Sequence, residues 1–455
     1  MSETMTQTVE RKLWYEGVNF TADAVVIDPA KDKILLIERN DTGEWALPGG
    51  FIDRDDPSAE YAAAREAMEE ADLSPRPAET ILFRGVVDDP RNSNDAWIET
   101  SAYLFFADVD EPLISGDDAK SVDWKDLGDL PGLYASHADI VELGIDYLGS
   151  VRKLRRPDMI TTMIPVDGGH MQYDKNFIEG GDTLVFSKAH RDENFTDSEK
   201  AERSKLYLRK EADVMAHLRT RGFAAVPEHS ALIDSELLME AFSPDNDWRW
   251  RAPKDATLSR YVKDTLMAFD ELEAMPLMSD TFDIEPSYLS FKREGWSALT
   301  DDTLAVIRER AETFFPRMNE SSRRSGEELL SMVEPLKVEA MRPHSPERYV
   351  ASHHDARQSN IAWHPEHGTK VIDWSWFGAG EPGSDATNFL IDIHKSGHDI
   401  RDYLDVMNEH HCLTLIGFWL AHASWPIHTG DDSVRFQQFV SAVSAYEVLK
   451  ILRER

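Results

Sequence analysis

The sequence predicts a two-domain protein of α/β and α+β class, and three observations support this prediction. The first 150 residues alternate strand-like runs rich in Val, Ile and Leu with helical patterns. A basic stretch follows and ends at Pro157, a pattern typical of a domain boundary. From residue 255 onward the pattern is mainly helical. We therefore expect domains over 1–150 and 165–455, joined by a linker over 151–164.

The elements of the first domain are predicted from residue type and from the residues that begin or end helices and strands. Strands are expected at 20–27, 33–37, 81–87 and 98–109. An alanine-rich helix from Pro57 to Leu73 lies among them, with Asp56 as its N-cap and Pro57 at its first position. A second helix is expected over 136–148.

The second domain begins with a predicted strand at 183–188 and a long helix over 198–220. Residues 232–242 are predicted as a strand pair and a hinge. Later, 369–374 is a strand-like exception in a helical region.

The composition argues against several classes of partner, cross-link and membrane segment. The chain of 455 residues has 84 acidic and 49 basic residues, a net charge of −35, which repels nucleic acid and anionic lipid. Cys412 is the only cysteine and excludes an intrachain disulfide or a thiolate zinc cluster. No apolar run approaches about 18 residues, and the N-terminus is unlike a signal peptide. We expect a cytoplasmic protein with no nucleic-acid or membrane partner, and a homodimer is compatible with the sequence.

Three carboxylates in the first predicted helix form the most informative pattern. Glu66, Glu69 and Glu70 are spaced i, i+3 and i+4, so they share one helix face. Oxygen-only clusters of this kind suit Mg²⁺ or Mn²⁺, whereas the competing interpretation is a solvated acidic face. Gly49-Gly50 permits a close backbone approach before the helix, and Arg65 is placed to anchor the preceding loop.

This region resembles the sequence box of the Nudix hydrolases. Gly50, Arg65-Glu66 and Glu69-Glu70 match the box. The chain departs from it at Asp56, which replaces a Glu and lies one residue too far from Arg65, at Ala67, and at Asp72, which replaces a Gly. Segments 44–50, 85–100, 116–119 and 133–137 extend the resemblance to mitochondrial-type ADP-ribose pyrophosphatases and the related ADP-ribose-sensing channel domain. The resemblance implies a Nudix α/β/α sandwich that hydrolyses ADP-ribose to AMP and ribose 5-phosphate.

The resemblance also implies roles for individual residues. Glu66, Glu69 and Glu70 would hold the metal ion, and Glu69 or Glu70 would accept the proton of the attacking water. Asp117 and Asp118 are the alternative bases. The expected substrate-binding residues are Arg91 for phosphate and Asn92, Asp95 and Trp97 for ribose or base. For each of these four residues the competing interpretation is a structured loop. We expect His137 to cap or pack at a helix start.

A second pattern lies at 353–360. Asp355 precedes Asn360 by five residues, and Asp373 follows a strand-like run. Phosphoryl transfer from ATP needs an acceptor-activating carboxylate and Mg²⁺ ligands, commonly an Asn and an Asp. The competing interpretation of 353–360 alone is a polar turn.

The pattern resembles the aminoglycoside phosphotransferase and choline kinase group, a bilobal protein-kinase-like fold. His353, Asp355, Asn360 and Asp373 match, Asp385 matches a structural Asp, and His354 stands where many members have Gly. The resemblance implies Asp355 as the catalytic base and Asn360 and Asp373 as metal ligands. The implied ATP-binding residues are Lys188, its ion-pair partner Glu211 with Glu202 as rival, and the hinge residues Met239, Glu240 and Ala241. Gly180-Gly181 is a weak candidate for a phosphate loop, and Trp248, Trp250, Trp374 and Trp376 are either core, lid or sugar-site residues.

Together these patterns predict a bifunctional enzyme. The first domain would hydrolyse ADP-ribose with Mg²⁺ or Mn²⁺, and the second would phosphorylate a small hydroxyl-bearing acceptor, a sugar or ribosyl compound, with ATP as donor. The alternative is a Nudix module that senses ADP-ribose and regulates a kinase for a small molecule, an antibiotic or a protein.

Overall fold

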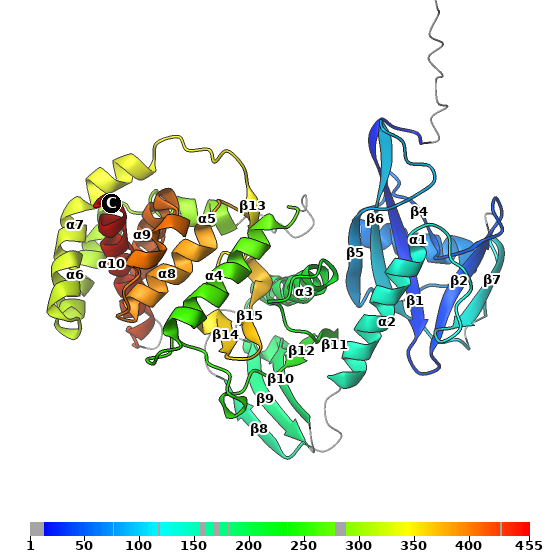
Figure 1. Ribbon diagram of the computed structural model, residues 1–455, viewed down its shortest axis with the longest axis horizontal. Coiled ribbons are helices and arrows are strands. Elements are labelled where there is room, and N and C mark those ends of the chain that lie inside the picture. Colours follow the sequence, from blue (N-terminus) through cyan, green and yellow to red (C-terminus); the bar gives the residue numbers. More distant parts are fainter. Residues whose placement is uncertain are drawn as a thin grey trace, which may run out of the picture. The chain divides into compact units, whose positions relative to one another are not determined.

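The computed structural model describes residues 13–75, 77–110, 112–116, 119–154, 160–166, 173–180, 183–233, 235–277, 288–427 and 430–455 (Figure 1). The chain divides into two compact units. The first comprises Met1–Gly222 with Pro227–Ala241, and the second comprises Phe223–Val226 with Phe242–Arg455. The division therefore falls at the predicted hinge, whereas the linker expected over 151–164 stays a prediction.

A mixed seven-stranded sheet begins the first unit. Its strands are β1 (Gly17–Asp28), β2 (Lys33–Arg39), β3 (Trp45–Ala46), β4 (Gly49–Phe51), β5 (Thr80–Val86), β6 (Ala96–Phe106) and β7 (Ala119–Asp126). The main path runs β3-β2-β1-β6-β5, with β4 paired to β1 and β7 paired to β2. Only β1 and β6 are parallel among these pairs of described strands.

Two helices cover the two faces of this sheet, because successive side chains of a strand point to opposite faces. Ala24 and Val26 of β1 pack in one apolar cluster with helix α1 (Ala59–Ala71). Val25 and Ile27 pack in another with helix α2 (His137–Lys153). The arrangement confirms the predicted α/β/α sandwich.

The start of α1 differs from the prediction. Its N-cap is Ser58, whose hydroxyl accepts a hydrogen bond from the Tyr61 amide at 3.1 Å. Asp56 is not the cap, because its carboxylate binds Arg65 instead. The basic residues Arg152 and Lys153 end α2, where cations interact favourably with the helix dipole.

A second, antiparallel sheet belongs to the same compact unit. Its strands are β8 (Thr162–Pro165), β9 (Asp174–Gly180), β10 (Thr183–Ala189), β11 (Ser230–Ile233) and β12 (Glu236–Glu240), in the order β11-β12-β10-β9-β8. Helix α3 (Ser198–Thr220) has the bounds that the sequence predicts. One apolar cluster continues from α2 into this sheet through Tyr147, Val185 and Leu238. The two sheets of this unit thus share a core.

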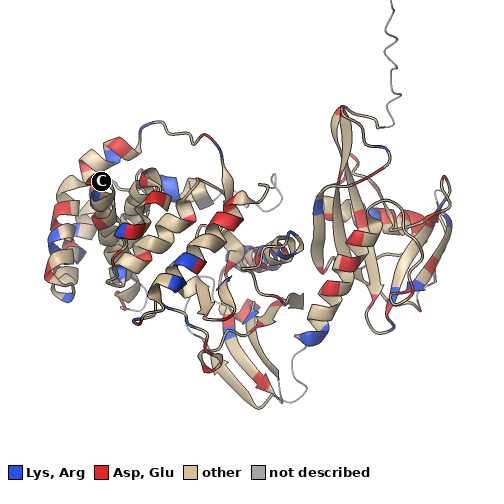
Figure 2. Ribbon diagram, viewed as in Figure 1, with Lys and Arg blue, Asp and Glu red and all other residues tan. Residues whose placement is uncertain are grey.

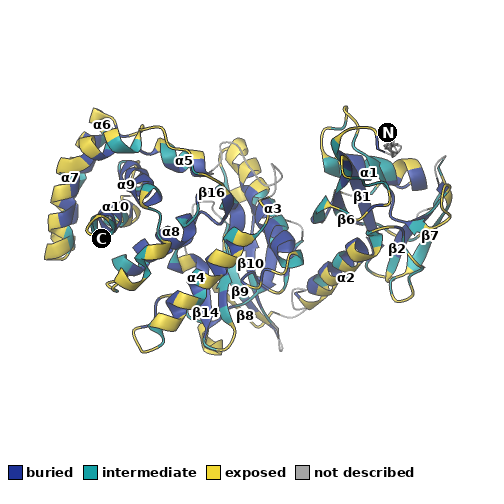
Figure 3. Ribbon diagram, turned by 45° about the horizontal axis from the view of Figure 1, so that its top comes forward, coloured by how far each residue is buried: buried dark blue, intermediate teal, exposed yellow. Residues whose placement is uncertain are grey.

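The second unit is mainly helical, as predicted. Its helices are α4 (Leu258–Ala274), α5 (Tyr288–Glu294), α6 (Asp301–Phe314), α7 (Glu320–Ala340), α8 (Ser384–Lys395), α9 (Glu409–Ala423) and α10 (Ser433–Arg453). Two small sheets pair β13 (Val350–Ser352) with β16 (Gly378–Gly380) and β14 (Ile361–His364) with β15 (Gly368–Val371). Most of α9 is buried, whereas α7 is exposed along one side (Figure 3).

Charge is spread over both units. Figure 2 shows Asp and Glu on many helices and strands, interspersed with Lys and Arg. Among the residues that the structure describes, no helix combines the length and apolar character that crossing a bilayer requires.

Candidate functional sites

The carboxylate face of α1 lies against β4. The Gly49 amide donates a hydrogen bond to Glu70 Oε2 at 3.0 Å. A Cβ atom at Gly50 would lie 2.4 Å from Glu66 Oε1, so a side chain there would displace this carboxylate. The two glycines therefore let the strand approach the acidic helix face, as the sequence predicts.

Arg65 holds the entrance to the helix. Its guanidinium binds both Asp56 oxygens, at 3.1 and 3.0 Å, and donates to the Phe51 carbonyl at 3.2 Å. Its Nη1 also donates to Glu66 Oε1 at 2.8 Å and to Glu69 Oε2 at 2.9 Å. The predicted anchoring role of Arg65 is confirmed, and the arginine additionally orients two of the predicted metal ligands.

The three carboxylates differ in their surroundings. Glu70 is buried, whereas the Glu69 side chain is 58% exposed. Burial raises the pKa of Glu66, and Arg65 opposes that shift. In the described structure the oxygen atoms of the three groups do not gather within 4.8 Å of one another. Their chemistry, three carboxylates on one face of α1, still fits Mg²⁺ or Mn²⁺, provided that Glu69 moves away from Arg65.

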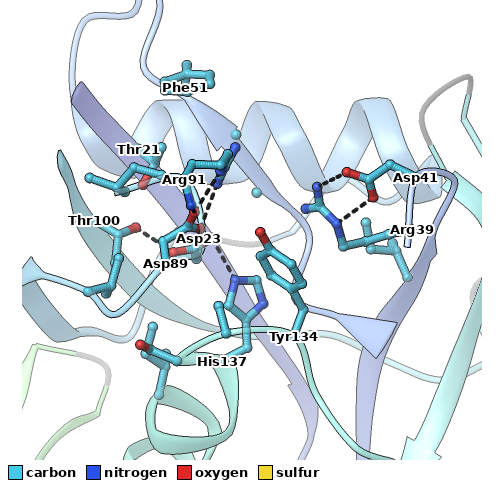
Figure 4. A pocket seen from close by; sticks show the side chains of 18 of the residues that line it. Thr21, Asp23, Arg39, Asp41, Phe51, Asp89, Arg91, Thr100, Tyr134 and His137 are labelled. Atoms are coloured by element: carbon cyan, nitrogen blue, oxygen red, sulfur yellow. Dashed lines mark hydrogen bonds and ion pairs between the residues drawn. The ribbon is translucent and has the colours of Figure 1, made fainter. Parts of the chain in front are cut away.

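A cavity of about 330 Å³ opens beside Glu70 (Figure 4). Its lining includes two ion pairs, Arg91–Asp89 and Arg39–Asp41, with nitrogen–oxygen distances of 2.8–2.9 Å. Tyr134 presents its ring to Arg39, whose Cζ lies 4.3 Å from the ring centroid. The cavity thus combines cations, carboxylates and an aromatic face, which suits a ligand with phosphate, hydroxyl and ring groups.

His137 also lines this cavity, and its place agrees with the expectation that it packs at a helix start. It is the first residue of α2, and its Nδ1 accepts a hydrogen bond from the Leu47 amide at 2.8 Å. Its Nε2 lies 4.0 Å from Asp23 Oδ1 (Figure 4). Because burial lowers the pKa of His137, a neutral ring is favoured.

The structure brings only one of the four predicted substrate-binding residues, Arg91, into the cavity lining. The Asn92 side chain instead clamps its own loop, binding the Val87 carbonyl at 2.7 Å and the Ile98 amide at 2.9 Å. Asp95 accepts from the Ser93 hydroxyl at 2.7 Å. Trp97 alternates with Ile98, which does line the cavity, and so faces the other side of β6. For these three residues the competing interpretation, a structured loop or strand, fits better.

Other predicted and unpredicted residues complete this site. Asp117 and Asp118, the alternative bases, lie outside the described residues. Arg39 and Tyr134 line the cavity but were not identified from the sequence. Tyr134 lies in a segment that carries the resemblance, so this signal was available, whereas Arg39 is the last residue of β2 and has no comparable signal.

The predicted lysine–glutamate pair is present. Lys188 Nζ lies 2.5 Å from Glu211 Oε2, and both side chains are buried. The rival, Glu202, pairs instead with Lys205 at 3.2 Å on the exposed side of α3. Of the hinge residues, Met239 and Glu240 end β12 and Ala241 ends the first compact unit. Gly181 lies outside the described residues.

The predicted catalytic loop is held by a dense set of hydrogen bonds. Asp355 Oδ2 accepts from Asn360 Nδ2 at 3.0 Å and from Arg357 Nη2 at 2.7 Å. His353 Nε2 lies 3.0 Å from the Ile372 carbonyl, the residue before Asp373. These contacts bring the loop at 353–360 and the segment that carries Asp373 together, as the motif requires.

Asp385 supports the same loop from α8. Its two carboxylate oxygens accept hydrogen bonds from the backbone amides of His353 and His354, at 2.6 and 2.8 Å. Lys292, which is fully buried on α5, donates to the His354 carbonyl at 2.5 Å. Both contacts fix the backbone of the loop. Of the four candidate tryptophans, Trp374 is a fully buried core residue.

Comparisons with protein families agree with these two sites. The NUDIX domain family matches residues 19–144, and the phosphotransferase enzyme family matches residues 182–408. The chain joins a NUDIX domain to a domain of the phosphotransferase enzyme family. The resemblances found in the sequence are therefore confirmed.

Individual relatives match the NUDIX domain. The mitochondrial ADP-ribose pyrophosphatase of Rattus norvegicus is 35% identical over 147 residues, covering 26% of this chain and 41% of the rat protein. The transient receptor potential cation channel subfamily M member-like 2 of Nematostella vectensis is 35% identical over 132 residues, covering 24% of this chain and 8% of that protein. The chain thus spans less than half the length of both relatives.

For the phosphotransferase domain, the solved structure of the choline kinase LicA from Streptococcus pneumoniae aligns with 13% identity and a TM-score of 0.39, covering 65% of this chain and 96% of that chain.

Two departures from the family patterns have a common backbone explanation. In the NUDIX domain, Asp72 replaces the box glycine and has a left-handed φ of 53° at the C-cap of α1. In the phosphotransferase domain, His354 replaces a frequent glycine and has φ 66°. Glycine adopts this conformation without strain, and Asp tolerates it better than most residues. The replaced glycines thus mark positions where the fold keeps the left-handed turn.

Proposed function

We propose that the chain is a bifunctional enzyme whose NUDIX domain hydrolyses ADP-ribose to AMP and ribose 5-phosphate. The observation that carries this proposal is the cavity beside Glu70, which places two arginines and an aromatic ring next to a carboxylate helix. The rat relative is named an ADP-ribose pyrophosphatase, which supports the same substrate.

Each group in the cavity has a role in this reaction. Glu66, Glu69 and Glu70 would hold Mg²⁺ or Mn²⁺, which supplies charge neutralisation and a more acidic water when bound. Glu69 or Glu70 accepts the proton of the attacking water. Arg91 and Arg39 exchange their carboxylate partners for phosphate oxygens, to which guanidinium groups bind in a bidentate manner. The carboxylates released in this exchange, on Asp89 and Asp41, are acceptors for ribose hydroxyls.

The phosphotransferase domain is proposed to transfer the γ-phosphoryl group of ATP to a small hydroxyl-bearing acceptor. Lys188, oriented by Glu211, would bind the ATP phosphates, and Asn360 and Asp373 would hold Mg²⁺. Asp355 accepts the proton of the acceptor hydroxyl. The backbone at Met239–Ala241 would bind adenine. A sugar or ribosyl acceptor is proposed because the two activities are fused in one chain.

Mass spectrometry of products tests both activities at once. The full chain is incubated with ADP-ribose, ATP, Mg²⁺ and candidate ribosyl acceptors. The Glu69→Gln, Glu70→Gln double variant should lose AMP release and keep phosphorylation, whereas Asp355→Asn should do the reverse. Unchanged AMP release by the double variant contradicts the hydrolytic assignment. Labelling of an aminoglycoside but of no ribosyl compound contradicts the proposed acceptor.

A second candidate function, in which ADP-ribose regulates phosphoryl transfer, is favoured by the packing of α3. Glu211 on this helix pairs with Lys188, and Asp213 two residues later turns toward β5 of the NUDIX domain. Asp213 Oδ1 accepts from the Thr80 hydroxyl at 2.9 Å, and the Asp213 side chain is 16% exposed. One helix therefore contacts both the ATP-site lysine and the NUDIX sheet.

Regulation is tested in the double variant that does not hydrolyse ADP-ribose. ADP-ribose should change the KM for ATP or the kcat of phosphoryl transfer, and Thr80→Val should abolish that response. Thr162→Val, at an exposed position of β8, is the matched control. If saturating ADP-ribose leaves the rate of phosphoryl transfer unchanged, this second function is contradicted, whereas the proposed hydrolysis of ADP-ribose is not affected.

A further inference from the structure

Three side chains from distant parts of the second unit converge behind the catalytic loop. His344 lies between α7 and β13, Glu381 follows β16, and His410 lies in the first turn of α9. One nitrogen of each histidine and one carboxylate oxygen lie within 4.8 Å of one another. Within the described part of the chain this is the one group of three such side chains.

The spacing of these atoms resembles a coordination shell. Glu381 Oε2 lies 3.4 Å from His344 Nε2 and 3.2 Å from His410 Nδ1. The 3.2 Å contact is also an ordinary hydrogen-bond distance, and the same oxygen accepts a hydrogen bond from Asn408 Nδ2 at 3.4 Å. Ligands bonded tetrahedrally to zinc at about 2.0–2.1 Å lie about 3.3 Å apart, which matches both distances.

The two imidazoles also lie unusually close. Their ring centroids are 3.5 Å apart, with an interplanar angle of 19°. Because an imidazole nitrogen binds a metal ion in the plane of its ring, the two stacked rings would tilt apart when both bind one ion. Nitrogen donors with a single carboxylate favour zinc and similar transition ions over Mg²⁺.

The carboxylate is held in the way that metal ligands usually are. Glu381 is 1% exposed, and its other oxygen, Oε1, accepts a hydrogen bond from Arg293 Nη2 at 2.6 Å. Such outer partners fix the orientation of a ligand. The next residue along α9, His411, is buried, and neither of its ring nitrogens has a hydrogen-bond partner among the described residues. Buried polar atoms normally have partners, so this region has unused capacity for a ligand or ordered water.

We propose that His344, Glu381 and His410 bind Zn²⁺ or a similar transition ion, with a fourth position left for water. The ion joins three chain segments, of which the pairing of β13 with β16 already brings those of His344 and Glu381 near each other, so the contact that it adds is to α9. Glu381 lies four residues before Asp385, which holds the amides of His353 and His354. The site therefore stabilises the support of the catalytic loop and is separate from the Mg²⁺ sites proposed above.

Metal analysis of the full chain, free of any histidine tag, tests this proposal. The protein is dialysed against Zn²⁺ in the presence of excess Mg²⁺, and bound zinc is measured by inductively coupled plasma mass spectrometry. Wild type should retain one equivalent. Co²⁺ in its place should give the intense visible absorption of a four-coordinate site with nitrogen ligands.

His344→Ala removes a ligand at a partly exposed position, so folding should survive, which circular dichroism checks. Loss of an outer partner of a ligand costs about 10–100-fold in metal affinity. Because His344→Ala removes a ligand itself, the affinity of this variant for zinc should fall by more than that. His398→Ala, outside the cluster, is the matched control. The Glu69→Gln, Glu70→Gln variant should keep the ion, which separates this site from the NUDIX carboxylates. Less than one equivalent in wild type, or unchanged binding by His344→Ala, overturns the proposal.

Discussion

Replacing Arg65 by Lys should weaken both the NUDIX domain and its metal site. Arg65 makes five side-chain hydrogen bonds, and its side chain is 19% exposed. Lysine keeps the charge but offers its donors from one nitrogen, so about three of these contacts should be lost. At about 1 kcal/mol each, with less for the exposed Glu69, the free energy of unfolding should fall by about 2–3 kcal/mol.

The Arg65→Lys substitution should weaken the binding of Mg²⁺ more than the binding of substrate. Arg65 orients Glu66 and ties α1 to the preceding loop, and loss of such an orienting partner typically costs about 10–100-fold in metal affinity. AMP release from ADP-ribose is therefore measured against Mg²⁺ concentration. Arg54→Lys, an exposed substitution in the same loop, is the control. If Arg65→Lys lowers stability but leaves half-saturation by Mg²⁺ unchanged, the arginine has only a structural role and the reasoning is refuted.

Three further predictions follow from single residues. Asp72→Gly should raise the free energy of unfolding by about 1 kcal/mol in denaturant titrations, because glycine relieves the left-handed strain at an exposed position; no gain would contradict this. Burial lowers the pKa of Lys292 from 10.5 to about 8. Between these two values the unfolded state binds more protons than the folded state, so the free energy of unfolding of the wild type should rise with pH. The expected rise is about 2 kcal/mol from pH 8 to 10. Lys292→Met should lack this rise, and an equal slope in both proteins would exclude the buried amine as its source. Arg39→Ala should raise the KM for ADP-ribose about 10-fold or more if the arginine binds phosphate, whereas Arg54→Ala should not.

The sequence predicts local structure well where one segment carries the whole signal. The bounds of α3 follow from helical periodicity. Glu211 was chosen over its rival Glu202 through the family resemblance, and Glu211 is the residue that pairs with Lys188. The N-cap of α1 was predicted wrongly, because Asp56 competes for two roles and its ion pair with Arg65 prevails over capping.

Features built from segments that are distant in the sequence could not be predicted from it. Arg39 and Tyr134 meet only because β2 and the segment before α2 adjoin in the folded sheet. The cluster of His344, Glu381 and His410 joins three segments, and no spacing in the sequence indicates it. For Asn92 and Trp97 the sequence left ligand contact and a structured loop both open. In the structure the Asn92 side chain closes its own loop, and strand alternation turns Trp97 away from the cavity.

The shared packing of α3 limits how this protein can be taken apart. A fragment that starts near residue 165 would contain every motif of the phosphotransferase family, yet Asp213 would lose Thr80, and Val185 and Leu238 would lose the apolar neighbours that α2 supplies. The boundary between the two families is therefore not a boundary between independently folding pieces. A cut at that point should give an unstable kinase fragment, because the NUDIX sheet and the sheet that carries Lys188 belong to one compact unit.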